Sequence, residues 1–177
     1  MCFALMGISI NDTLLDTIVN DMIQKTVEIN NCACSAIISN PLSDYLKLAD
    51  TYQKLKEGFH IRMIRKQQWQ YIFLDELQYD RIMLHISEDT EVHQFIRCKL
   101  GSLVEYDRAH DTQLLETLEA LIQNHNSRKL AAESLFLHRN TMVHRINKIE
   151  EVLHCSLDDT EIMEQLEFAI KMKMYAH

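Results

Sequence analysis

Glycine and proline are scarce in this sequence: the 177 residues include three glycines and one proline. Both residue types mark turns and flexible linkers, and both interrupt helices. The chain also contains no low-complexity linker and no internal repeat. The boundary between its two halves, near residues 87–105, is therefore expected to be helical and stiff.

Features of membrane-spanning and secreted proteins are missing too. No apolar run reaches the roughly 20 residues that a membrane helix needs. The apolar start, Met1–Ile10, has neither the basic residues nor the cleavage site of a signal peptide. An odd number of cysteines in a chain of this length indicates reduced thiols instead of a disulfide framework; they are Cys2, Cys32, Cys34, Cys98 and Cys155. We expect a cytoplasmic protein that does not contact membranes.

Recognisable catalytic and metal-binding sets are absent. Cys32 and Cys34 supply only two ligands, too few for a zinc site. The paired carboxylates Asp75-Glu76 and Asp158-Asp159 are explained by turns and helix caps. No Ser/His/Asp set and no phosphate loop occurs. We therefore predict no catalytic residue, no metal, no cofactor and no enzymatic activity.

The first half alternates strand-like and helix-like segments, which is typical of an α/β layer. Apolar runs of strand length are Cys2–Ile10, Cys32–Ser39, Ile61–Ile64 and Trp69–Leu74. A helix is expected after a cap at Asn11 or Asp12, ending at Asn30-Asn31. The segment Leu77–Ile86 is ambiguous and is compatible with a helix.

A second helix is expected after a cap at Ser43 or Asp44. Gly58 stands where a C-terminal cap belongs. Apolar residues at helical spacing predict the inner face of this helix: Tyr45, Leu46, Leu48, Ala49, Tyr52 and Leu55.

The second half shows no strand signal after Leu103. Helices are predicted over Glu88–Gly101, after a cap at Thr112, and after a cap at Asp158 or Asp159. The predicted fold class is α+β overall, with an N-terminal α/β module followed by an all-α domain. We place the modules at 1–86 and 109–177, with a helical connector over 87–108.

Charge is distributed unevenly along the chain. The net charge is −8 at pH 7. The stretch from His125 to Ile149 nevertheless carries five basic residues against the single acidic Glu133, a net of +4. A basic island in an acidic chain suits a compact unit that binds a DNA groove.

The stretch Asn126–Glu151 predicts two helices joined by a turn. The first, Ser127–Leu135, places the small residues Ala131 and Ala132 where two helices must approach closely. Residues 136–138 form a turn of helix-turn-helix length. An amphipathic helix pair alone is more often a solvated hairpin, but the alanines, the turn length and the basic island together favour DNA binding.

The second helix of this pair has an apolar stripe at helical spacing: Met142, Ile146, Ile149 and Leu153. The opposite side carries side chains that are able to read base edges in the major groove, and the predicted base contacts are Arg139, Asn140, Val143, His144 and Asn147. The predicted phosphate contacts are Asn126, Ser127, Arg128, Thr141, Arg145 and Lys148. Arg145 lies near the edge of the stripe, so its stem is expected to pack inward and its head to reach a phosphate or an acidic neighbour.

The stretch AAESLFLHRNTMVHRINKIEEVL resembles the C-terminal helix-turn-helix domain of the PucR and CdaR family of bacterial transcriptional regulators. The resemblance continues upstream through LGSLVEYDRAHDTQLLETLEALIQNHN and downstream through SLDDTEIMEQLEFAIKM, so it covers about residues 99–174. It implies a sequence-specific DNA-binding transcriptional regulator that reads the major groove with the helix around residues 139–152. Many helix-turn-helix proteins have glycine in the turn where this chain has Phe136.

The segment SAIISNPLSDYLKLADTYQKLKEG is similar to part of the GGDEF-like domain of CdaR-type proteins. Nucleotide cyclases related to that domain hold phosphate with a glycine-rich turn. This chain has only Gly7, Gly58 and Gly101, with no paired glycines. The resemblance therefore implies a degenerate regulatory or dimerisation module without cyclase activity.

The expected partner is double-stranded DNA, bound by a homodimer on repeated half-sites. The resemblance implies that relatives carry an N-terminal sensory domain, so we expect a small-molecule effector to act through a domain not present in this chain. Two alternatives stay open: a degenerate cyclase-like protein that binds nucleotide, and a protein–protein adaptor that uses the helical domain.

Overall fold

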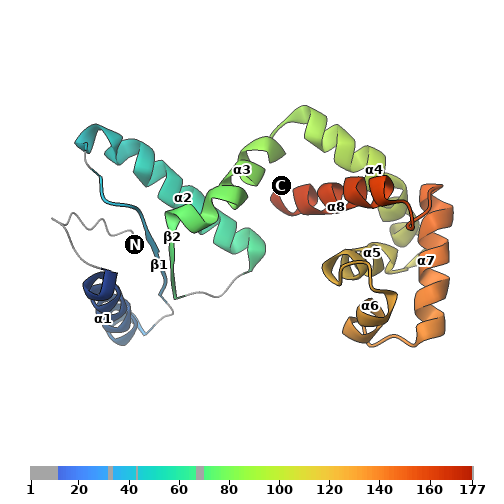
Figure 1. Cartoon of the computed structure of the whole chain (residues 1–177), viewed down its shortest axis with the longest axis horizontal. Coiled ribbons are helices and arrows are strands. Elements are labelled where there is room, and N and C mark those ends of the chain that lie inside the picture. The colour runs from blue at the N-terminus through green and yellow to red at the C-terminus, as the bar shows by residue number, and fades with distance from the viewer. Residues whose placement is uncertain (1–11, 32–33, 43, 67–69, 177) are drawn as a thin grey trace. The chain divides into compact units, whose positions relative to one another are not determined.

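The computed structural model describes residues 12–31, 34–42, 44–66 and 70–176. It divides into two units, residues 1–84 and 85–177 (Figure 1). The predicted strand Cys2–Ile10 and the predicted cap Asn11 lie outside the described residues. No described helix is both long enough and apolar enough to cross a membrane.

Helix α1, Asp12–Asn30, opens the described part of the first unit. Val19 and Ile23 are buried on one side of it, as the helical spacing predicted. The helix ends as expected at the asparagine pair, and Asn31 has a left-handed φ of 49°. Asparagine tolerates this conformation, which suits it to the end of a helix.

Two short strands pair in parallel: β1, Ala36–Ile38, and β2, Tyr71–Phe73. Ile37 lies opposite Ile72 in the register. The predicted strands over 32–39 and 69–74 are confirmed in these shorter forms. The hydroxyl of Tyr71 donates a hydrogen bond to Asp16 of α1 at 2.9 Å, which ties that helix to the sheet.

The predicted strand Ile61–Ile64 is wrong, because those residues belong to helix α2, Leu48–Arg65. A 3₁₀ turn, η1, Tyr45–Lys47, precedes this helix, and the Asp44 carboxylate caps it by accepting from the Leu46 N–H. Gly58 is not a C-terminal cap, since the helix continues to Lys66, which has a φ of 51°.

The predicted inner face of α2 is also wrong. Tyr45, Leu46, Leu48 and Tyr52 are exposed, and the buried face consists of Thr51, Gly58 and Ile61. A Cβ at Gly58 would lie 2.7 Å from the Ile37 Cδ1 atom. The missing side chain therefore lets β1 approach the helix, and that approach decides which face is buried.

The 3₁₀ turn η2, Leu74–Leu77, and helix α3, Gln78–Ser87, follow β2. The helical reading of Leu77–Ile86 is confirmed. Arg65 Nη1 lies 2.8 Å and 2.9 Å from the two carboxylate oxygens of the buried Asp80. This ion pair holds α3 against the end of α2.

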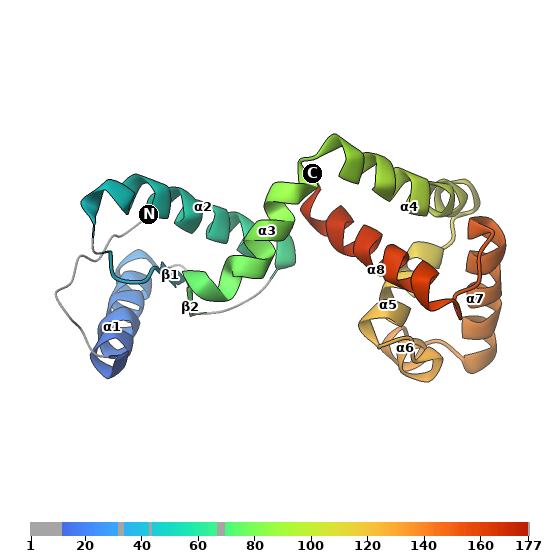
Figure 2. The ribbon, with the colours of Figure 1, turned by 45° about the horizontal axis from the view of Figure 1, so that its top comes forward.

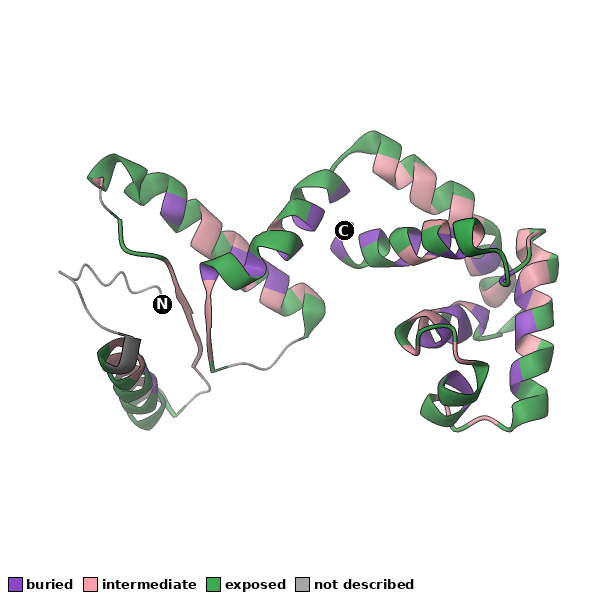
Figure 3. Cartoon of the chain, viewed as in Figure 1, coloured by how far each residue is buried: buried purple, intermediate pink, exposed green. Residues whose placement is uncertain are grey.

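The second unit is built from five helices in its described part: α4, Thr90–His110; α5, Leu114–Gln123; α6, Arg128–Ser134; α7, Arg139–Leu153; and α8, Thr160–Tyr175. Helix α8 lies along α4 in both ribbon views (Figure 2). Buried side chains of all five helices form one core, which includes Leu103, Leu118, Ala131, Ile146 and Leu166 (Figure 3).

The prediction of an all-α second half is confirmed, whereas the sheet in the described residues has two strands where the sequence suggested four. Helix α4 occupies most of the segment 87–108, for which we expected a helical connector. Its Leu100 and Leu103 are fully buried in the core of the second unit. Asp159 caps α8, as predicted, by accepting from the N–H groups of Glu161 and Ile162.

The predicted capping of α5 by Thr112 is wrong. The carboxylate of Asp107, in the last turn of α4, accepts from the N–H groups of Leu114 at 2.8 Å and Leu115 at 2.9 Å. Thr112 instead donates its hydroxyl to the same carboxylate at 2.6 Å. The cap comes from the preceding helix because α5 packs against α4 after a short link.

Replacing Asp107 with alanine is expected to lower the free energy of unfolding of the second unit by about 1–3 kcal/mol, since two helix N–H groups lose their acceptor. Asp107→Asn keeps one acceptor oxygen and should lose less. Urea unfolding followed by circular dichroism measures both. If Thr112→Ala cost as much as Asp107→Ala, the threonine and not the aspartate would be the important group.

Candidate nucleic-acid interface

Ser127 caps the start of helix α6, and its side chain accepts from the Leu130 N–H at 3.4 Å. Ala131 and Ala132 are buried, and α6 packs on both α5 and α7. Small side chains at this position permit the close approach that a helix-turn-helix requires. The helix pair expected from Asn126–Glu151 is therefore present, in the expected order.

The turn after α6 is closed by a Schellman pair of hydrogen bonds. The Leu137 N–H donates to the Ala132 carbonyl at 2.8 Å, and the Phe136 N–H donates to the Glu133 carbonyl at 3.1 Å. This motif requires a left-handed residue after the helix, usually glycine. Here the residue is Phe136, which has a φ of 54° and is 97% exposed.

His138 caps the start of helix α7: its Nδ1 atom lies 3.3 Å from the backbone nitrogen of Asn140 and accepts a hydrogen bond from it. Accepting through Nδ1 requires the proton of a neutral ring to be on Nε2. The cap leaves Arg139 and Asn140 in the first turn, next to the exposed turn residue. Both side chains are exposed.

The faces of α7 separate as the sequence predicted. Met142, Ile146 and Ile149 are buried against the core. The opposite side is exposed and consists of Asn140, Val143, His144 and Asn147. Within the described part of the chain, none of the three polar side chains in this group makes a hydrogen bond or an ion pair. Their donors and acceptors are therefore available to an external ligand.

Arg145 packs inward at its stem, as expected for a residue at the edge of the stripe. Its guanidinium donates to Thr117 Oγ1 and to Gln113 Oε1, each at 3.1 Å. These neighbours are neutral oxygens, not acidic groups: Gln113 directly precedes α5, and Thr117 lies in its first turn. Sequence reasoning missed both residues, although they are four positions apart at the start of a helix that packs against α7. In this arrangement Arg145 ties α7 to α5.

Two of the predicted phosphate contacts are ion-paired. Arg128 Nη2 lies 2.7 Å from an Asp158 oxygen, in an exposed pair. Lys148 Nζ lies 2.9 Å from Glu151 and 5.2 Å from the centre of the Tyr106 ring. The hydrogen bond that Lys148 donates to the Glu151 carboxylate raises the pKa of Lys148 above its ordinary value, so this lysine is charged at neutral pH.

The other predicted contacts lie near the ends of the two helices. Asn126, with a φ of 61°, directly precedes the cap Ser127 and is exposed, and Thr141 is exposed on the first turn of α7. The side chain of Arg139 forms no ion pair within the described residues. Arg139 is therefore a cation that no carboxylate neutralises at the start of α7.

The described part of the chain contains no group of three or more His, Cys, Asp or Glu side chains arranged to hold a metal ion. The thiol of Cys155 is partly buried, and this burial raises its pKa. It lies beyond the C-terminal end of α7.

Residues 114–172 match the family model of the PucR C-terminal helix-turn-helix domain. The purine catabolism regulatory protein of Bacillus subtilis is 33% identical over 91 residues, which cover 51% of this chain and 17% of that protein. The proline-responsive transcriptional activator PutR of the same species is 31% identical over 133 residues, 73% of this chain and 32% of that protein.

The DNA-binding transcriptional activator AdeR, also of Bacillus subtilis, is 28% identical over 74 residues, 42% of this chain and 18% of that protein. The chain therefore spans about a third or less of the length of these curated relatives. No solved structure matches the chain.

Replacing Phe136 with asparagine is expected to raise the free energy of unfolding of the second unit by about 1 kcal/mol. Asparagine tolerates the left-handed backbone conformation, whereas the same conformation costs phenylalanine about 1–2 kcal/mol in steric energy. The exposed ring contributes no packing that would be lost. Phe136→Ala is the matched control, because it removes the ring and keeps the backbone cost. Equal stabilities of the Asn and Ala variants in urea unfolding would contradict this account.

Proposed function

We propose, on the premise that this chain belongs to the PucR family of transcriptional regulators, that it binds specific DNA sequences and thereby controls transcription. Helix α7 is the element that enters the major groove. The proposal assigns no catalytic step to the chain, which acts as a regulator and not as an enzyme.

The outward face of α7 carries this proposal. Asn140, His144 and Asn147 are exposed and have no partner within the described chain, and Val143 lies among them. Asparagine recognises adenine through paired hydrogen bonds, histidine reaches guanine, and the valine methyls meet the methyl of thymine. Arg139, at the start of the helix, completes the set of base contacts that we propose.

Phosphate contacts orient the domain on the duplex in this proposal. The N-terminus of α6 offers backbone N–H groups beside Asn126, Ser127 and Arg128, a favourable environment for an anion. Thr141, Arg145 and Lys148 extend the contact along α7. Arg128 exchanges Asp158 for a phosphate, since an exposed ion pair contributes only about 0–1 kcal/mol and is easily replaced.

A homodimer is the assembly that we propose. One recognition helix reads a short half-site, so two copies bind repeated half-sites about 34 Å apart, or a multiple of that distance. The first unit serves as a regulatory or dimerisation module of the GGDEF-like type. A protein with this function works in the cytoplasm, where the bacterial chromosome lies.

The base-reading assignment is tested by selecting bound duplexes from a random pool with the native chain and with two variants. Asn140→Ala and His144→Ala should each relax the preference at one or two base positions, at a cost of about 1–3 kcal/mol. Glu164→Gln on α8 is the control and should leave the selected sequence unchanged. Unchanged selection by both α7 variants would refute the assignment of α7 as the recognition helix.

Phosphate anchoring is tested at the Arg128–Asp158 pair with a salt titration. Arg128→Ala should weaken binding to all duplexes alike and reduce the slope of log affinity against log salt by about 1. Asp158→Asn should strengthen binding to all of them, because it removes the carboxylate that competes with phosphate. Native binding that does not weaken as salt increases would contradict a groove-binding function.

A further inference from the structure

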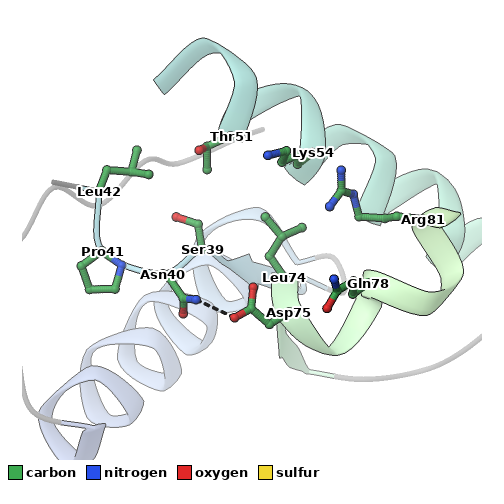
Figure 4. A pocket seen from close by; sticks show the side chains of 10 residues that line it. All are labelled: Ser39, Asn40, Pro41, Leu42, Thr51, Lys54, Leu74, Asp75, Gln78 and Arg81. Carbon is green, nitrogen blue, oxygen red and sulfur yellow. Dashed lines mark hydrogen bonds between the residues drawn. The ribbon is translucent and has the colours of Figure 1, made fainter. Parts of the chain in front are cut away.

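A cavity of about 300 Å³ lies in the first unit (Figure 4). Its walls come from four parts of that unit: Ser39–Leu42 after β1, the residues that follow β2, the first half of α2, and Arg81 of α3. The proposed function uses none of these residues. The cavity is thus a separate candidate for ligand binding.

The sheet topology explains why a cavity forms here. Strands β1 and β2 run parallel and end together at Ile38 and Phe73. Beyond this edge the two chain segments separate, one toward α2 and the other into η2 and α3. Crevices at the carboxyl ends of parallel strands are common binding sites in α/β proteins because loops diverge there.

Two cationic side chains line the cavity, Lys54 from α2 and Arg81 from α3. Each is held by a carboxylate on α2: Lys54 pairs with Asp50, and Arg81 Nε lies 2.8 Å from Glu57. The bond to Glu57 uses only one of the N–H donors that a guanidinium carries. The cations are therefore oriented by their partners and keep donors for a ligand.

The opposite wall of the cavity is polar, and a hydrogen bond already connects two of its residues. Asn40 donates to the carboxylate of Asp75 at 2.5 Å, and this pair joins the segment after β1 to the segment after β2. Figure 4 shows Lys54 and Arg81 on the side of α2 and α3, with the Asn40–Asp75 pair across from them. Asp75 is the single acidic residue in the lining, which also holds the two cations; their partners Asp50 and Glu57 lie outside the lining.

We propose that this cavity binds a small organic anion through a carboxylate or phosphate group held by Lys54 and Arg81. Its volume lies at the lower limit of the roughly 300–1,000 Å³ typical of ligand pockets, which fits a compact metabolite. The lining contains no aromatic ring on which a nucleobase would stack. A simple carboxylate or phosphate compound therefore suits the cavity better than a nucleotide. This site does not depend on DNA binding by α7.

The test is a titration of the isotope-labelled full chain with succinate, inorganic phosphate and GTP, each followed by nuclear magnetic resonance at constant ionic strength. Saturable shifts of the amides of residues 39–42 and 74–78 with succinate or phosphate are expected. The anion that binds with the higher affinity identifies the group, carboxylate or phosphate, that the cavity prefers. Saturation by GTP alone would overturn the proposal.

Substitutions connect the binding to the two cations. Lys54→Gln and Arg81→Gln should each weaken anion binding about tenfold or more, as expected for the loss of a charge-assisted hydrogen bond. Lys56→Gln removes the same charge from α2 outside the cavity and should leave binding unchanged. If circular dichroism shows that Arg81→Gln is unfolded, Arg81→Lys replaces it, because this variant retains the positive charge. Arg81→Lys is expected to bind the anion at least as well as Lys54→Gln does.

Several outcomes would overturn the proposal. Shifts that grow linearly without saturation would indicate only non-specific ionic contact. Saturable binding that persists with full affinity in Lys54→Gln would place the anion elsewhere. The same conclusion would follow if the control Lys56→Gln weakened anion binding as much as Lys54→Gln does. Because no DNA is present in this experiment, failure of the anion site and failure of the DNA-binding proposal are distinguishable.

Discussion

The burial of Met142, Ile146 and Ile149 against the core of the second unit is the interaction on which the proposed DNA-binding surface depends. Each side chain contributes about 1.5–3 kcal/mol when it is fully removed from water. Because these residues share one side of α7, their burial sets the rotation of the helix. Asn140, His144 and Asn147 then necessarily face solvent, and Arg145 falls at the edge, where Gln113 and Thr117 hold its guanidinium.

Capping groups set the positions of the short helices around α7. Asp107 fastens the start of α5 to the end of α4, and His138 caps α7 directly after the turn. Phe136 occupies the left-handed position of that turn with an exposed side chain. Its backbone cost is not offset by packing within the described chain. The turn therefore keeps its geometry through its two hydrogen bonds and the packing of Ala131 and Ala132.

Local patterns predicted the second unit better than the first. The apolar stripe of α7 repeats over several helical turns. An exception at one position would therefore not have changed the predicted buried face. In α2 the same method selected Tyr45, Leu46 and Tyr52, which are exposed. A glycine and a threonine lie on the buried side instead, because β1 needs room next to the helix. The polarity of the residues in α2 could not indicate which face is buried, since that face depends on its packing against β1, a separate segment of the chain.

The amino-acid sequence by itself determined the helix pair, its turn, the separation of the α7 faces and the basic character of residues 125–149. These features depend on neighbours within about a dozen positions, so spacing and charge are sufficient to identify them. Only the tertiary structure decided that α4 belongs to a core, that Asp107 caps α5, and that Arg145 is tied to α5. It alone brought Lys54, Arg81 and Asp75 to the end of two parallel strands, because contacts between distant segments depend on packing that no local pattern encodes.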